Sequence, residues 1–267
     1  AKIAKVKLVY IPTGCNEEDT REVISKIDNG NICDRNCGSA DRCFDSLNLL
    51  NFARIRRYFD MSIGLGFFNS TQLKMTHMKY RSIDLKLWSP DLEIPENFNL
   101  PDTGKLRILH TFFDEGRMFE GKNIKGSPII VAAIKKLEAE GYPVEYVFFR
   151  DRHIAEVRFL QAQADIVVEE LLYGMWGSTG VEVMALGKPL VTYLRPEWKD
   201  FFLKTFPEYS SLPIIQANVK NIYEELKKLV IDTDYRRRKG QESRCFSEAH
   251  FSPEMNTKAF AKLLEAL

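Results

Sequence analysis

Residues 174–191 read GMWGSTGVEVMALGKPLV, a glycine-punctuated loop followed by a short helical pattern, a turn and an apolar run. The Gly-Lys-Pro turn at 187–189 ends the helix, because proline cannot continue it, and the run that follows is typical of a buried strand. A loop leading into a helix N-terminus presents backbone N–H groups and the positive end of the helix dipole, which suit phosphate. A tight turn packed on small residues explains the same pattern, so the loop alone leaves both interpretations open.

Composition limits the class of protein. The chain has 267 residues, 45% hydrophobic and 28% charged, as expected of a globular protein with one large or two modest α/β domains. The net charge of +1 does not favour a nucleic-acid partner. No apolar run reaches the roughly 20 residues that span a bilayer, and no signal peptide is evident. We therefore expect a cytoplasmic protein, with peripheral contact at the inner face of a membrane left open.

The cysteines are concentrated near the start of the chain. Four of the five are Cys15, Cys33, Cys37 and Cys43. Their spacing allows a four-thiolate structural zinc site in a loop-rich insertion at about 29–43. Disulfides are disfavoured in a cytosolic chain, and free thiols are a third interpretation.

The first part of the chain has the pattern strand, helix, strand. The expected strands are 6–11 and 61–67, and the helix between them, 47–59, is expected to bury Leu47 and Leu50 among its apolar residues. We predict a partial N-terminal α/β domain at 1–82. Three prolines at 83–104 then indicate an extended interdomain linker.

Strands and helices alternate in the remainder, 105–267, which predicts a parallel sheet covered on both faces. The expected strands are 106–111, 144–149, 165–168, 190–194 and 213–216. Ser127 is expected to be the N-cap of the first helix, with proline in its first turn. Ligands of such sheets bind at the carboxyl ends of the strands.

Several polar residues follow those strand ends. Lys125 and Gly126 directly precede the first helix, where a lysine can meet a diphosphate, and Arg117 lies in the same long loop. His110 ends a strand as either a site residue or a satisfied core histidine, and Glu170 is expected to be a carboxylate on the ligand side.

These motifs together resemble the C-terminal, donor-binding domain of the GT-B glycosyltransferases. The resemblance rests on four elements: the strand that ends near His110, Lys125-Gly126 before a helix, ADIVV at 164–168, and the stretch 174–191. The E-x-M-A-x-G-x-P core at 182–189, within this last stretch, is the most specific part. The resemblance is closest to the retaining group of bacterial glycan and lipopolysaccharide transferases. It implies a GT-B-like fold with two Rossmann-type parallel-sheet domains, of which the N-terminal, acceptor-side one is short or incomplete.

The resemblance also implies roles for individual residues. It implies that Glu182 binds the ribose hydroxyls of a UDP- or GDP-sugar and that Lys125 neutralises the phosphate of the leaving group. The donor is expected to be received by Gly126, by the loop residues Gly177, Ser178, Thr179 and Gly180, and by the flanking Arg117, His110 and Glu170. The implied reaction is sugar transfer to a glycan or lipid-linked acceptor, with no cofactor required for catalysis.

The chain departs from the family pattern at two places. Many members carry a glutamate eight residues before the ribose-binding one, where this chain has Gly174, and a histidine after the first strand, where it reads IPTG at 11–14. Two alternatives therefore stay open: a GT-B-shaped nucleotide-sugar epimerase, and a non-catalytic nucleotide-sugar-binding or scaffold protein.

Overall fold

The chain divides into two compact units, residues 1–82 with 253–267, and residues 83–252. The computed structural model describes residues 6–12, 14–27, 32–33, 37, 43–65, 70–78, 82–110, 123–149, 151–265 and 267. The proline-rich segment 83–104 lies in the second unit, and the last helix lies in the first.

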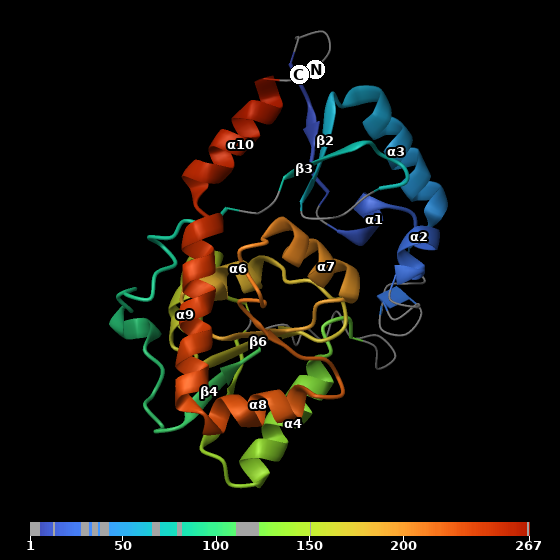
Figure 1. Cartoon of the computed structure of the whole chain (residues 1–267). Helices are drawn as coiled ribbons and strands as arrows, with labels where there is room; N and C mark the ends of the chain where they lie inside the picture. The colour runs from blue at the N-terminus through green and yellow to red at the C-terminus, as the bar shows by residue number, and fades with distance from the viewer. Residues whose placement is uncertain are drawn as a thin grey trace. The chain divides into compact units, whose positions relative to one another are not determined.

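The first unit contains a three-stranded parallel sheet in the order β1-β2-β3 (Figure 1). The strands are β1 (Val9–Tyr10), β2 (Met61–Leu65) and β3 (Met75–Met78), and the helices are α1 (Cys15–Glu18), α2 (Arg21–Ser25), α3 (Asp45–Tyr58) and α10 (Pro253–Glu265). The strand, helix, strand order is as expected. The strand β3 was not expected, and β1 is only two residues long.

Helix α3 buries a narrower stripe than the sequence suggested. Phe52 and Ile55 pack with Leu73 in the core of this unit, whereas Leu47 and Leu50 are 58% and 48% exposed. At 100° per residue, Leu47 and Leu50 lie roughly 100° or more from the stripe that Phe52 and Ile55 form. The prediction that both leucines are buried is therefore wrong.

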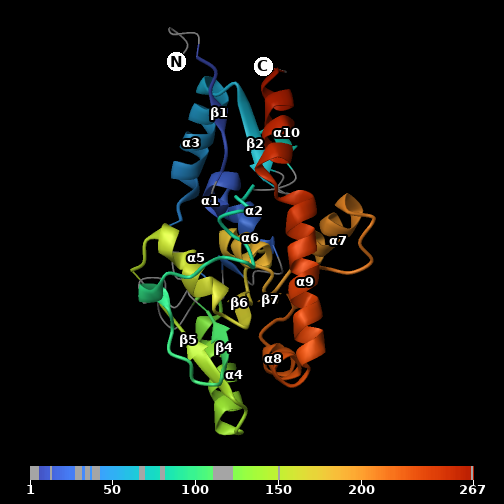
Figure 2. The same ribbon diagram turned by 90° about the vertical axis from the view of Figure 1, so that its left-hand side faces the viewer.

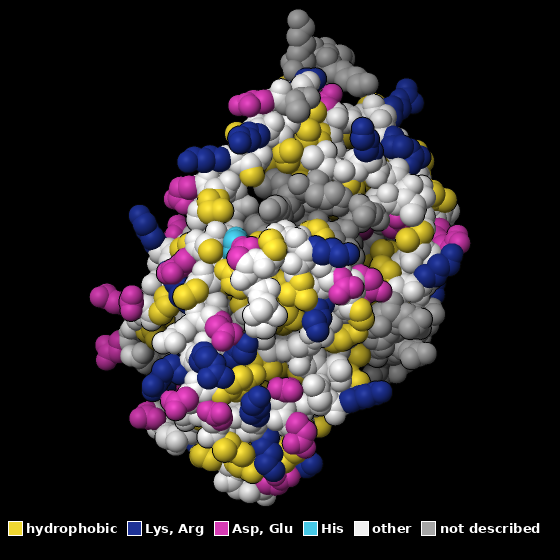
Figure 3. All heavy atoms as spheres, in the orientation of Figure 1, with side chains coloured by type: hydrophobic (Ala, Val, Ile, Leu, Met, Phe, Trp, Pro, Cys, Tyr) yellow, Lys and Arg dark blue, Asp and Glu magenta, His cyan; other side chains and the backbone are white. Residues whose placement is uncertain are grey.

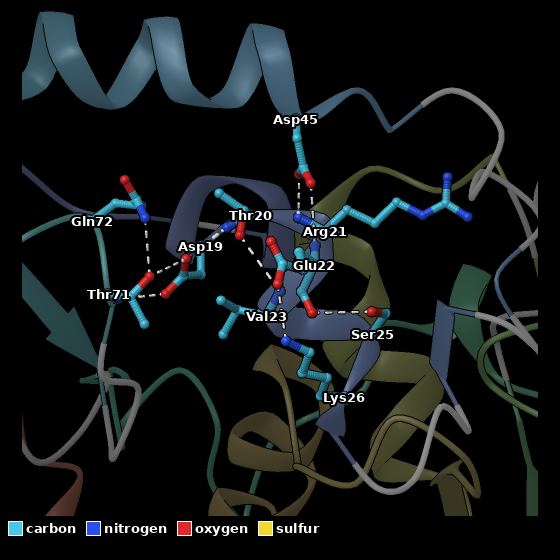
Figure 4. A network of polar contacts seen from close by, with 10 residues as sticks. All are labelled: Asp19, Thr20, Arg21, Glu22, Val23, Ser25, Lys26, Asp45, Thr71 and Gln72. Atoms are coloured by element: carbon cyan, nitrogen blue, oxygen red, sulfur yellow. Dashed lines mark hydrogen bonds and ion pairs between the residues drawn. The ribbon is translucent and has the colours of Figure 1, made fainter.

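Two carboxylates organise the short helices of this unit (Figure 4). Asp19 is buried and accepts hydrogen bonds from the backbone amide and the hydroxyl of Thr71, at 2.5 and 2.9 Å. Asp45, the first residue of α3, accepts the amides of Arg21 and Glu22 at the start of α2. An acceptor at a helix N-terminus satisfies amides that lack intrahelical partners, so Asp45 ties α2 to α3.

The second unit contains a five-stranded parallel sheet in the order β5-β4-β6-β7-β8. The strands are β4 (Leu106–Leu109), β5 (Val144–Val147), β6 (Ile166–Glu170), β7 (Leu190–Thr192) and β8 (Ile215–Gln216). The helices are η4 (Glu96–Phe98), α4 (Ser127–Ala139), α5 (Ile154–Ala162), α6 (Ser178–Ala185), α7 (Pro196–Thr205), α8 (Ile222–Ile231) and α9 (Thr233–His250).

Helices cover both faces of this sheet, as the alternating pattern predicted. One face packs against α4 and α8, with Ile108, Ile166 and Val191 contributing to the shared core. The neighbouring residues Leu109, Val167 and Leu190 are buried as well, which a parallel strand requires when both of its faces are covered. Figure 2 shows α9 running from beside α6 toward α8, and α9 packs against both of these helices.

Candidate functional site

The strand order places a topological switch point between β4 and β6. The chain passes from β4 to β5 on one side of β4, and then returns to β6 on its other side. Helices that leave two neighbouring strands in opposite directions open a crevice at the carboxyl ends, where ligands of open parallel sheets bind. The loops that follow β4 and β6 are therefore the first places to seek a site.

These two loops meet through the backbone. The amide of Leu171, directly after β6, donates a hydrogen bond to the carbonyl of Lys125 at 3.0 Å. Gly126 adopts φ 74°, and a Cβ placed on it would lie 3.3 Å from the Leu171 Cβ. The left-handed backbone and the close approach both favour glycine at this position.

Gly126, and not Ser127, is the N-cap of α4, so the predicted cap is wrong by one residue. The buried side chain of Asn123 replaces a capping serine. Its Oδ1 accepts the amides of Lys125 and Ser127, at 3.0 and 3.2 Å. Asn123 was not among the residues predicted from the sequence. An asparagine shortly before a helix is nevertheless a known signal for a turn in which its side chain accepts nearby backbone amides.

His110 lies in the core beneath the α4 N-terminus. Its Nδ1 is 2.8 Å from the Val168 carbonyl oxygen and its Nε2 is 2.8 Å from Ser127 Oγ. Because a carbonyl only accepts, Nδ1 carries the proton and Nε2 accepts from the serine hydroxyl. Burial lowers the pKa of His110 to about 4; the Val168 hydrogen bond opposes this, and the charge of Lys125 adds to it. The ring is therefore neutral near pH 7 and supports the loop, instead of lining an open edge.

Glu170, at the end of β6, is also fully buried. Its carboxylate accepts the amides of Tyr173 and Gly174 at 2.6 and 2.8 Å, so it holds the loop that leads to α6. Burial raises the pKa of Glu170 to about 7, whereas the positive charge of Lys125 lowers it. Lys125 thus acts electrostatically on two buried titratable groups of the switch point, His110 and Glu170.

A second buried carboxylate, Glu169, lies against the N-terminus of α6. Its Oε1 accepts the amide of Gly177, the N-cap of α6, at 2.7 Å. A Cβ placed on Gly177 or Gly180 would lie within 2.9 Å of this carboxylate, so both glycines make room for it. The Gly177 amide, which the resemblance assigns to a diphosphate, is engaged by an internal anion in this structure.

Glu182 projects from α6 toward α5. Its Oε2 accepts a hydrogen bond from Gln161 Nε2 at 2.7 Å. Burial raises the pKa of Glu182, the Gln161 hydrogen bond lowers it, and the charge of Glu169 raises it. Gln161 fixes one carboxylate oxygen, and it was not identified from the sequence.

Gly174 has a structural reason to be glycine. It adopts φ 88°, and a Cβ on it would lie 2.9 Å from the Cβ of the buried Arg195. The amide of Arg195 also donates to the Gly174 carbonyl at 3.0 Å. In this structure Arg195 and the left-handed backbone therefore leave no room for a side chain at the position where many GT-B enzymes carry a glutamate.

The four clustered cysteines influence one another. Burial, together with the charges of Cys15, Cys37 and Cys43, raises the pKa of Cys33 to about 12. None of these thiols forms a disulfide. Within the described part of the chain, no three His, Cys, Asp or Glu side chains are disposed to hold a metal ion, so zinc binding stays a prediction.

Two further expectations concern Arg117 as a donor-binding residue and contact with a membrane. Arg117 falls within 111–122, outside the residues that the structure describes. Among the described helices, none combines the length and the hydrophobicity that crossing a bilayer requires.

The comparisons with known proteins concern the fold. No protein-family model matches the chain, and no curated protein matches it by sequence. The solved structure of HepE from Anabaena in complex with UDP and glucose matches 100% of this chain and 73% of its own, with a TM-score of 0.62 and 14% identity. Sucrose-phosphate synthase from Thermosynechococcus elongatus matches 97% of this chain and 67% of its own, with a TM-score of 0.62 and 15% identity.

A glycosyltransferase from Rickettsia africae gives a TM-score of 0.51 at 12% identity, over 76% of this chain and 62% of its own. At such identities the similarity concerns the architecture, and it agrees with the two parallel sheets described above. The chain therefore has a GT-B-like fold, the fold of the glycosyltransferases that it resembles in structure.

Proposed function

We propose that the unit formed by residues 83–252 binds a nucleotide-sugar donor at its switch point, and that the protein is a glycosyltransferase acting on a glycan or lipid-linked acceptor. The observation that carries the proposal is the hydrogen bond between the Leu171 amide and the Lys125 carbonyl. It joins the lysine loop and the loop leading to α6 at the edge where ligands of such sheets bind. The solved HepE structures contain UDP, with glucose or as UDP-glucose, which supports a donor of this class.

The assigned roles follow from charge and position. Departure of a nucleoside diphosphate builds negative charge on its phosphates, and a preorganised cation lowers that barrier. Lys125 is the proposed catalytic residue, with Arg117 as a second proposed cation of the same loop. The amides at 177–180 and the α6 dipole add to the same field.

Glu182 is proposed to bind the ribose, with Gln161 holding the carboxylate in place. Its test is Glu182→Ala, which is expected to weaken UDP binding about tenfold or more, because the two hydrogen bonds that the ribose hydroxyls donate to the carboxylate are lost. Isothermal titration with UDP measures the loss, and Glu156→Ala, on the first turn of α5, is the control. Unchanged affinity in Glu182→Ala would contradict the ribose assignment.

A non-catalytic nucleotide-sugar-binding protein is the second candidate. Gly174, closed against Arg195, favours it, because the chain lacks the acid that many GT-B enzymes carry there. Incubation of UDP-glucose with a panel of glycan and lipid-linked acceptors separates the candidates. Acceptor-dependent release of UDP supports a transferase, release of UDP without an acceptor supports an epimerase or hydrolase, and binding without turnover supports the non-catalytic protein.

A further inference from the structure

A pocket of about 420 Å³ opens in the second unit, at the amino ends of its strands. Asp165, directly before β6, and Pro189, directly before β7, both line it. The switch point lies at the carboxyl ends of the same strands, so this pocket is a separate place in the fold. Its volume falls within the range of roughly 300–1,000 Å³ that is usual for small-molecule sites.

The lining is strongly cationic. Four basic side chains and a single acidic one, Asp165, face the pocket; the basic ones are Lys188, Arg236, Arg237 and Arg244. The chain as a whole carries a net charge of only +1, and Figure 3 shows basic and acidic side chains interspersed over the face that it draws. The pocket is therefore a local concentration of positive charge, which attracts anions.

Two of the arginines are fixed by backbone carbonyls. Arg236 Nη1 donates to the Leu229 carbonyl at 2.6 Å, and Arg244 Nη1 donates to the Trp88 carbonyl at 3.0 Å. A guanidinium that is already oriented loses little side-chain freedom when an anion binds, and its planar donor fork matches phosphate oxygens. These residues provide a preformed wall.

Lys188 is a basic residue of the pocket without a polar partner of its own among the described residues. It is partly buried on the turn between α6 and β7, and among the described residues its ammonium group has neither a hydrogen bond nor an ion pair within 4.0 Å. Burial lowers the pKa of Lys188, and Asp165 only partly offsets this. Desolvating a cation without a partner costs free energy, and a bound anion would remove that cost.

Glycine contacts build the walls around Lys188. A Cβ placed on Gly240 of α9 would overlap the Gly187 carbonyl oxygen, and a Cβ on Gly187 would lie 3.3 Å from Pro90 Cγ. Three segments distant in sequence, the Pro90 turn, the turn at 187–189 and α9, therefore approach closely only because glycine stands at these positions. The cationic residues are brought together by this packing.

We propose that this pocket, formed by Lys188, Arg236, Arg237 and Arg244, binds the phosphate group of a small phosphorylated molecule or of inorganic phosphate. The proposal does not depend on the donor site at the switch point. Four basic side chains line the pocket, and of these Arg244 is paired with a carboxylate, Glu248 at 2.7 Å, in the part of the chain that the structure describes. The remaining positive charge matches an anion with more than one negative charge. The open volume leaves room for an organic part beyond the phosphate.

The chain contains a reporter for this site. Cys245 lines the pocket and is exposed, so its alkylation rate reports occupancy. The rate of alkylation by iodoacetamide is followed by peptide mass mapping. It is measured without a ligand, with inorganic pyrophosphate and with glucose 1-phosphate. Each ligand is present at about 1 mM, a concentration that detects dissociation constants of this order. We expect Cys245 to react at least about twofold more slowly, because a site that is at least half occupied leaves at most half of the protein reactive. The rates of the other cysteines are expected to stay unchanged.

A matched pair of variants tests the residues. The test variant is K188M/R237Q, because among the described residues neither Lys188 nor Arg237 donates a hydrogen bond to a backbone carbonyl, so the fold does not depend on such a contact at either position. The control K199M/R238Q also removes two positive charges, but outside the pocket. We expect K188M/R237Q to abolish the protection of Cys245 and K199M/R238Q to retain it. Lys125→Met, at the switch point, is also expected to retain it.

The ligand source is read from the two probes. Protection by pyrophosphate alone identifies an inorganic anion, and stronger protection by glucose 1-phosphate identifies a phosphate ester. An unchanged alkylation rate of Cys245 with both probes in the wild type, or equal protection in K188M/R237Q, would overturn the proposal.

Discussion

The Oε1 atom of Glu169 accepts a hydrogen bond from the amide of Gly177 at 2.7 Å, at the start of α6. A carboxylate therefore occupies part of the helix N-terminus that is proposed to receive a diphosphate. The interaction is favourable for the helix, because the positive end of its dipole meets a negative charge. It also means that a phosphate must either bind beside Glu169 or replace it at Gly177.

The charge of Glu169 is predicted to weaken diphosphate binding. Glu169→Gln keeps an oxygen acceptor for Gly177 but removes the negative charge, so the affinity for UDP is expected to rise about fivefold or more, about 1 kcal/mol, from lost repulsion. Isothermal titration measures the affinity. Glu197→Gln, in the first turn of α7, is the control for a general charge effect. Weaker UDP binding in Glu169→Gln would mean that the carboxylate assists the ligand.

Lys125 is predicted to act on the leaving group. Lys125→Met is expected to lower kcat/KM about 10²-fold, the usual effect of removing one preorganised electrostatic contact. Lys135→Met, on the exposed surface of α4, is the matched control and should keep full turnover. The measurement is UDP release from UDP-glucose with an accepted acceptor, and full turnover in Lys125→Met would remove the assignment.

A comparison of Gly174 with Gly104 separates the free-energy cost of a strained backbone from the cost of steric overlap when a side chain is added. Both adopt positive φ, 88° and 65°, but only Gly174 has the Arg195 Cβ within 2.9 Å of an added Cβ, whereas Gly104 has nothing within 4 Å. Gly104→Ala is expected to cost about 1 kcal/mol of unfolding free energy from backbone strain alone. Gly174→Ala is expected to cost about 3 kcal/mol, because overpacking adds to the strain. Urea unfolding measures both, and equal losses would contradict the steric role of Arg195.

His110 and Glu170 are predicted to have opposite effects on stability against pH. The pKa of His110 falls from 6.5 to about 4 on folding, so its contribution is present above pH 6.5 and is lost as the pH falls toward 4. The pKa of Glu170 rises from 4.5 to about 7, so its contribution is present below pH 4.5 and is lost as the pH rises toward 7. Between pH 4.5 and 6.5 the rise in unfolding free energy with pH that comes from His110 and the fall that comes from Glu170 offset each other.

Glu170→Gln removes the contribution of Glu170 to the pH dependence of the unfolding free energy. We expect the unfolding free energy of this variant to rise by about 3 kcal/mol more than that of the wild type between pH 4 and 7, because the His110 contribution is no longer offset. Urea unfolding across that pH range measures the difference, with Glu145→Gln on β5 as the control. Parallel curves for the wild type and Glu170→Gln would contradict the buried titration of Glu170.

Regular patterns made most of the second unit predictable. The apolar runs before Glu169 and after Pro189 are long enough to identify buried strands, and a glycine followed closely by proline is a common end of a helix. The strand β3, which reads MTHM, was missed because it is short and carries no alternation. Serine is a common N-cap, so the sequence favours Ser127, whereas the close approach of Gly126 to Leu171 is visible only in the folded chain.

The site was predictable only as far as its loops. Lys125 and Glu182 stand out by their place before or within a helix. Asn123 and Arg195 act through bonds to backbone atoms and through close packing, and periodicity contains no information about either. The burial of His110 depends on the hydroxyl of Ser127 and the carbonyl of Val168, which meet only when the sheet is assembled.

Helix α6 is anchored at its carboxyl end. Arg244 donates to the Ala185 carbonyl there, and Gly240 lets α9 rest directly on the turn that follows. Because these contacts hold the carboxyl end of α6, a displacement of this helix is easiest at its N-terminus. A rearrangement that accompanies occupation of the α6 N-terminus would therefore fall on the loop at 171–177, and it would have to break the hydrogen bonds that hold Gly174 to Glu170 and Arg195.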